Sequence, residues 1–180
     1  MPVYKFKDRK PRFNSTVFID DGATIVGDVV IDAGSSIWPN AVIRADNSKV
    51  RIGKNVNIQD NVVINSKANG HVLIGDNVSV GHGAILHGCE IGNNVLVGMG
   101  AIVMDNAKID NWVLIGAGTI IVQNALIPSK SLVLGIPGKV IKELDEEKIC
   151  YITENAKEYV ELAKQYLKLQ STSKSRSLFE

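Results

Sequence analysis

Two histidines five residues apart are the side chains in this sequence with the clearest potential for chemistry. His82 and His87 lie in the segment GHGAILHGC, residues 81–89. Side chains that can accept, donate or carry charge precede them along the chain: Arg44, Asp46, Asn57, Gln59, Asp60 and Asn65. Such residues form a candidate functional site only if the fold brings them together.

A six-residue period decides how these residues are placed. A branched aliphatic residue recurs every six positions from Ile19 to Val133, with short irregularities after Ile43, Ile64 and Leu86. A small or branched residue stands two positions before most of these anchors, and alternate residues of a strand share one face, so both point inward. Six residues suit a short strand plus a tight turn. The pattern therefore predicts an all-β solenoid, a parallel β-helix in which three repeats close one coil.

The same period predicts which outward residues stack on one another, because anchors three repeats apart lie one coil apart. One column is Arg44, Asn65, His87 and Met104, and a second on the preceding face is Asp60 and His82, with Gln59 beside Asp60. The period slips at 45–50 and 65–73, which we expect to be loops next to these columns. Insertions in a solenoid usually gather on its functional side. The sequence thus predicts a polar cluster on two adjacent faces of an otherwise plain rod.

The chain divides into three expected parts. The hexapeptide period ends after residue 133, and apolar residues then recur at helical spacing up to about Leu169. We expect a β-helix domain at 1–140, a C-terminal α-helix at 141–170 that packs along the solenoid or onto a neighbouring subunit, and a polar tail at 171–180.

Several motifs resemble the γ-class carbonic anhydrase family of hexapeptide-repeat proteins. They are IRAD at 43–46, NIQD at 57–60, GHGAILHGC at 81–89, VGMG at 97–100 and LGIPGKV at 134–140. The resemblance covers residues 1 to about 168. It implies left-handed coils, a homotrimer and a divalent metal ion, zinc by preference, at each subunit interface.

The resemblance also assigns roles to the candidate residues. Three histidines bind the metal in this family, two from one subunit and one from its neighbour. His82 and His87 match two of these ligand positions, and Asn65 stands at the third. The catalytic-site positions that match are Arg44 with Asp46 as a structural ion pair, Asn57 and Gln59 as polar groups near the bound water, and Asp60 in the same motif.

Asn65 is the departure from the family pattern. An amide is a poor, neutral ligand for zinc, and catalytic zinc usually has three good protein ligands plus a water. His71, within the 65–73 segment, is a candidate to complete the triad, although a solvent-exposed loop histidine is the simpler interpretation. Neither expected loop contains a glutamate that would export protons. We therefore expect little or no carbonic anhydrase activity.

Three functions remain open at this point. The first is reversible hydration of carbon dioxide to bicarbonate, for which a bound metal would lower the pKa of water to about 7. The second is a catalytically silent trimeric scaffold or binding protein. The third is a hexapeptide acyltransferase, which usually carries its catalytic histidine on a longer loop, whereas the histidines here match the metal motif.

Composition limits the remaining classes. Lys and Arg number 20 against 19 Asp and Glu, so the formal net charge of +1 gives no sign of a nucleic-acid or membrane partner. No run approaches the roughly 20 apolar residues of a membrane span. Cys89 and Cys150 lie far apart and are interpreted as reduced thiols, with Cys89 at an inward position. These features predict a cytoplasmic protein.

Overall fold

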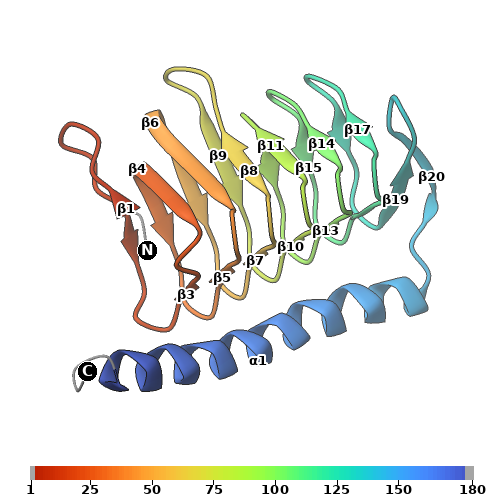
Figure 1. Ribbon diagram of the computed structural model, residues 1–180. Coiled ribbons are helices and arrows are strands. Elements are labelled where there is room, and N and C mark those ends of the chain that lie inside the picture. The colour runs from red at the N-terminus through yellow and green to blue at the C-terminus, as the bar shows by residue number, and fades with distance from the viewer. Residues whose placement is uncertain (1–2, 177–180) are drawn as a thin grey trace.

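The chain forms a three-sided β-solenoid with a single long helix along one side (Figure 1). This description comes from a computed structural model and covers residues 3–176, with side chains up to residue 171. The coils are left-handed, and each strand pairs in parallel with the equivalent strand of the next coil. The fold class predicted by the six-residue period is confirmed.

The strands lie on three faces, two of which share long strands. The face covered by the helix, here called the helix face, consists of β3 (Phe18–Ile19), β5 (Ser36–Ile37), β7 (Asn57–Ile58), β10 (Ser79–Val80), β13 (Leu96–Val97), β16 (Leu114–Ile115) and β19 (Ser131–Leu134), followed by antiparallel β20 (Lys139–Glu143). The histidine face consists of the first parts of β4 (Thr24–Ile31) and β6 (Val42–Ile52), then β8 (Val63–Asn65), β11 (Ile85–His87), β14 (Ile102–Val103) and β17 (Ile120–Ile121). The third face consists of the last parts of β4 and β6, then β9 (His71–Ile74), β12 (Glu90–Ile91), β15 (Lys108–Ile109) and β18 (Leu126–Ile127). At the N-terminal end, β1 (Val3–Tyr4) and β2 (Arg12–Phe13) also pair with β4.

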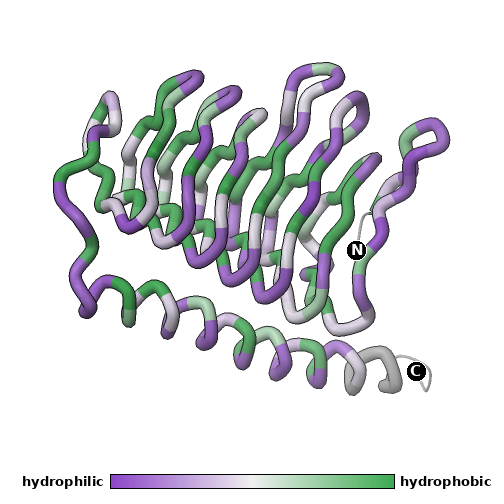
Figure 2. The backbone as a smooth tube through the Cα atoms, turned by 180° about the vertical axis from the view of Figure 1, so that it is seen from behind, coloured by the Kyte–Doolittle hydropathy of each residue, from purple (hydrophilic) through white to green (hydrophobic). Residues whose placement is uncertain are grey.

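The inward columns form the core. Every predicted anchor from Ile19 to Val133 is buried, with at most 7% of its surface exposed. The observed register aligns Ile43 with Ile64 and Leu86 with Val103, as the period predicts. Hydrophobic segments therefore recur from coil to coil along the solenoid (Figure 2).

One of the two expected loops is a strand. Residues 45–50 belong to β6, which runs without interruption and pairs with β4, β8 and β9. Ala45, Ser48 and Val50 are buried, so this segment keeps inward-facing side chains while it passes from the histidine face to the third face. The six-residue period did not predict this strand. The extra residues at 45–50 interrupt the period, although their inward side chains still belong to the core. The second expected loop is shorter than 65–73, since β8 ends at Asn65 and β9 begins at His71.

The helix α1 (Glu146–Arg176) runs back along the helix face toward the first coils (Figure 1). Asp145 caps its start by accepting a hydrogen bond from the Lys148 backbone N–H at 2.9 Å. Its far half packs Tyr159, Ala163 and Leu167 against an aromatic pair in the first two coils, Phe18 and Trp38.

This helix continues past residue 170, where the helical spacing predicted a polar tail to begin. The side chain of Gln170 donates to the Ile19 carbonyl at 3.0 Å, so contact with the first coil extends to this point. Residues 177–180 of the expected tail lie outside the described residues. Within residues 3–176, no helix has the length and apolar character needed to cross a membrane.

Candidate metal centre

His82 lies in the turn after β10, at the corner between the helix face and the histidine face. Its Nδ1 lies 2.9 Å from Oδ2 of Asp60, the residue predicted to stack on it one coil away. Its backbone N–H donates to Gln59 Oε1 at 3.1 Å. The imidazole is nevertheless 47% exposed, so it can reach a ligand outside its own chain.

His87 ends β11 and stacks directly on Asn65 of the preceding coil. Its Nδ1 lies 3.0 Å from Oδ2 of Asp105, which comes from the following coil, and its side chain is 39% exposed. Asp105 was not among the predicted site residues. The predicted column of stacked residues ended at Met104. The next residue along the chain, Asp105, provides the carboxylate that orients His87.

Both histidines therefore have a carboxylate oxygen close to Nδ1: His87 shares a hydrogen bond with Asp105, and His82 lies within ion-pair distance of Asp60. An imidazole whose Nδ1–H donates to a carboxylate is held in one tautomer, with the lone pair of Nε2 available as a ligand. Metal-binding histidines are commonly held in this way by carboxylates or carbonyls. The donor set of His82 and His87 thus fits a divalent metal ion.

Asn57 and Gln59 lie behind His82 rather than on the open surface. Gln59 Nε2 donates to Asn57 Oδ1 at 3.0 Å, and Asn57 Nδ2 donates to Ser79 Oγ at 2.8 Å. Asn57 and Gln59 are both buried. This chain of amides connects the helix face to the backbone of His82 and fixes the turn that carries it.

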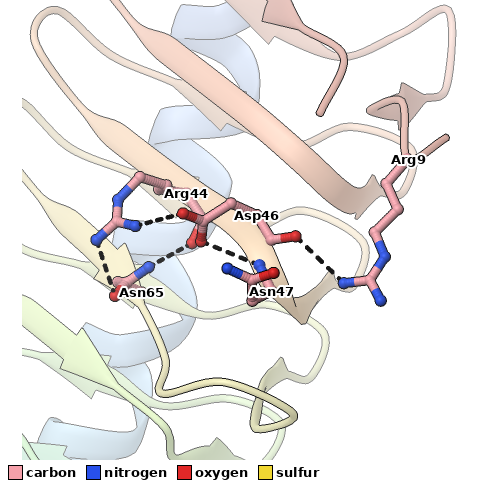
Figure 3. Close-up of polar contacts among 5 residues, drawn as sticks. All are labelled: Arg9, Arg44, Asp46, Asn47 and Asn65. Atoms are coloured by element: carbon pink, nitrogen blue, oxygen red, sulfur yellow. Dashed lines mark hydrogen bonds and ion pairs between the residues drawn. The ribbon is translucent and has the colours of Figure 1, made fainter. Parts of the chain in front are cut away.

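A second polar group surrounds Arg44 on the histidine face (Figure 3). Arg44 Nη1 pairs with Asp46 Oδ2 at 2.7 Å, and Arg44 Nη2 donates to Asn65 Oδ1 at 3.2 Å. Asn65 Nδ2 in turn donates to the Arg44 carbonyl at 2.6 Å. Arg9 Nη1 reaches the Asp46 carbonyl at 3.3 Å, which attaches the N-terminal segment to this group.

The charge on Asp46 is stabilised by these contacts. Desolvation by burial would raise the pKa of its carboxyl group, but the hydrogen bond from the Asn47 backbone and the contacts with Arg44 lower the pKa below its usual value. Asp46 therefore remains ionised and holds the Arg44 guanidinium beside Asn65.

The amide of Asn65 does not fit the role of a third strong metal ligand. Both its oxygen and its nitrogen are engaged by Arg44. His71 does not replace it, because His71 lies on the third face with Nε2 3.1 Å from Glu90 Oε1. Between residues 3 and 176, one chain brings no three His, Cys, Asp or Glu side chains together as a metal-binding group.

Comparison with known proteins places this arrangement in a family. The sequence profile of the bacterial transferase hexapeptide family (six repeats) matches residues 88–123. A protein of Methanocaldococcus jannaschii named probable carbonic anhydrase is 56% identical over 83% of this chain and 94% of its own length. The chain belongs to the γ-carbonic-anhydrase-like family of hexapeptide-repeat proteins.

Two further proteins resemble this chain over most of its length. The mitochondrial gamma carbonic anhydrase 2 of Arabidopsis thaliana is 40% identical over 87% of this chain and 58% of its own length. The crystal structure of a putative acetyltransferase of Bacillus cereus has a TM-score of 0.91 and 41% identity, and the match covers 93% of this chain and 97% of that one. Proteins similar to this chain therefore carry names from two enzyme classes.

Proposed function

We propose that this protein is a γ-carbonic-anhydrase-like homotrimer with a divalent metal ion, by preference zinc, at each subunit interface. His82 of one subunit and His87 of its neighbour are the proposed protein ligands. The observation that carries the proposal is a pair of histidines that each have a carboxylate oxygen next to Nδ1, at 2.9 Å for His82 with Asp60 and 3.0 Å for His87 with Asp105. Within residues 3–176 no three His, Cys, Asp or Glu side chains of one chain come together as a metal-binding group, and the proposed site therefore takes its ligands from two subunits.

The proposed reaction is the hydration of carbon dioxide to bicarbonate. A bound metal would supply an acidified water, and hence hydroxide, near neutral pH. The residues of the chain would act around it: Asp60 and Asp105 orient the two imidazoles, and Gln59 fixes the turn of His82. Arg44, paired with Asp46, would fix the position of the Asn65 side chain beside the metal.

We propose further that activity is low or absent in the native sequence. Two imidazoles bind zinc less strongly than three and leave more coordination positions to water. The Asn65 amide contributes little, since Arg44 engages it at both ends. This same observation favours a second candidate function, a trimeric scaffold or binding protein that retains the fold without catalysis.

Three measurements on the purified full-length protein test the proposal. Light scattering at micromolar concentration is expected to give a trimer. Elemental analysis after dialysis against zinc is expected to give up to one ion per chain, and stopped-flow assays to give slow hydration of carbon dioxide. A monomer, or zinc retained by the protein without both His82 and His87, would contradict the proposed site. Acetyl transfer from acetyl-coenzyme A, with release of free coenzyme A, would favour the acyltransferase alternative.

The proposal also includes a cytoplasmic location. Cys89 and Cys150 are both free thiols, which suits a reducing compartment.

A further inference from the structure

The last strand of the helix face, β20, has one uncovered edge. Among the described strands it pairs with β19 alone, and it ends the sheet at the opposite end of the solenoid from the N-terminus (Figure 1). All five of its residues are exposed. The N–H and C=O groups along such an edge can pair with another strand, and proteins usually cover or interrupt them. β20 is therefore a candidate contact surface.

Ile141 lies at the centre of this edge, and β19 offers it no partner residue. Val140 lies opposite Val133 and Lys142 lies opposite Leu132, so Ile141 is the extra residue of a β-bulge. Ile141 is 56% exposed and Val140 is 46% exposed. Exposed apolar side chains on an edge strand are typical of association sites.

The charges of β20 are arranged symmetrically about Ile141. Lys139 lies two residues before it and Glu143 two residues after it. Within residues 3–176 neither of these two side chains forms an ion pair, whereas Lys142 pairs with Asp145 at 2.8 Å. In an antiparallel pair of two β20 strands centred on Ile141, each Lys139 would lie opposite a Glu143. Two ion pairs would then flank one apolar contact.

This charge pattern favours a second copy of the chain over other occupants. A register centred between Val140 and Ile141 would place Lys139 opposite Lys142, and like charges directly opposite each other are destabilising. Lysines on an edge strand discourage pairing with unrelated strands, but a copy of β20 supplies the matching carboxylate. A two-fold axis makes the two strands antiparallel and brings the same residues of both copies into contact.

We infer that β20 is a docking surface for β20 of a second copy of this chain, paired antiparallel about Ile141. The proposed metal ligands, His82 and His87, lie in the middle coils, whereas β20 follows the last coil, so the two contacts use different parts of the solenoid. Pairing at β20 would join two trimers end to end. The inference rests on the proposed function only for the number of chains in the unit that doubles.

Sedimentation equilibrium of the full-length protein over a range of concentrations tests the inference. Contacts through one short strand are small, and small interfaces are weak and transient. We expect a dissociation constant on the order of 100 µM, so that trimers predominate at micromolar concentration and hexamers at about 1 mM.

Charge reversals test the pairing itself. Lys139→Glu and Glu143→Lys each place like charges opposite each other, and each variant alone should double at least about tenfold more weakly than the native protein. An equimolar mixture of the two variants should associate like the native protein, because each introduced charge then meets its opposite. The double variant with both changes should also double, and it provides the test if one single variant does not fold.

Lys67→Glu is the matched control, since it makes the same change of charge in the loop between β8 and β9. It should double like the native protein. A native assembly that does not double up to about 1 mM, single variants that double like the native protein, or a mixture or double variant without recovery would each overturn the inference. Doubling from monomer to dimer with the same charge dependence would support the β20 contact and refute the trimer, so the two failures are distinct.

Discussion

Asn65 and Arg44 hold each other across two adjacent coils by a reciprocal pair of hydrogen bonds. The Asn65 amide nitrogen donates to the Arg44 carbonyl at 2.6 Å, and the Arg44 guanidinium donates to the Asn65 oxygen at 3.2 Å. Arg44 is held in turn by Asp46. The position that should supply a third imidazole is thus part of a structural network on the solenoid wall.

Replacing Asn65 by histidine tests whether this position limits the metal site. Asn65→His places an imidazole one coil from His87, on a strand that is already fixed by parallel pairing. We expect zinc affinity to rise by at least about tenfold and the hydration rate to rise with it, since a third imidazole completes the usual ligand set.

Competition titration with a zinc chelator and stopped-flow hydration assays measure these two effects. Asn65→Ala is the matched control, because it also removes the bonds to Arg44 but adds no ligand, and it should show no gain. If Asn65→His changes neither quantity, the third ligand lies elsewhere.

The two remaining histidines should act from different subunits. His82→Ala and His87→Ala are each expected to remove most of the bound zinc. When the two variants are co-expressed, mixed trimers should recover part of the metal, because some interfaces then combine an intact His87 with an intact His82. Elemental analysis of the isolated mixed trimers measures this recovery.

His71→Ala provides the control for this experiment. His71 pairs with Glu90 on the third face, so its removal should leave zinc content unchanged. Loss of zinc in His71→Ala, or no recovery in mixed trimers, would refute the proposed arrangement.

Asp105 should contribute to metal binding without touching the metal. Asp105→Asn keeps the size of the side chain but weakens the hydrogen bond that orients His87. Changes at such supporting residues typically lower metal affinity 10- to 100-fold, and we expect zinc affinity to fall within that range.

Thermal unfolding of the metal-free protein provides the structural control. Asp105 Oδ1 is buried and accepts no hydrogen bond from the described part of the chain, so an amide at this position should leave the melting temperature nearly unchanged. A large loss of stability with unaltered zinc affinity would assign Asp105 a structural role only.

The two cysteines should differ sharply in reactivity. Burial raises the pKa of the Cys89 thiol to about 12, so almost none of it is thiolate at pH 8, and the thiolate is the reactive form. Cys150 is exposed. A thiol reagent at pH 8 should therefore modify one cysteine in the native protein and two in denaturant. Rapid native labelling of Cys89, identified by peptide mass spectrometry, would contradict the buried position.

The periodic part of this molecule could be predicted from the sequence, because inward residues repeat at a fixed interval. The stacking of Asn65 on His87 and of Asp60 near His82 followed from counting anchors, and the structure confirms both. Non-periodic features were harder to predict. Asp105 lies at a corner, where the direction of a side chain depends on backbone turns that the period does not describe.

The return of α1 along the helix face has a consequence for how the protein unfolds. In a solenoid, each coil contacts only its neighbours, so the end coils normally fray first and independently. Here the helix starts after the last coil and ends against the first two, where Tyr159 and Tyr166 pack on Trp38 and the side chain of Gln170 donates to the Ile19 carbonyl. The first and last coils are therefore both attached to α1. Unfolding of either end coil should loosen the helix and, with it, the contacts of the other end coil. We expect hydrogen exchange to report a single cooperative unit in place of a gradient of protection from the ends to the middle.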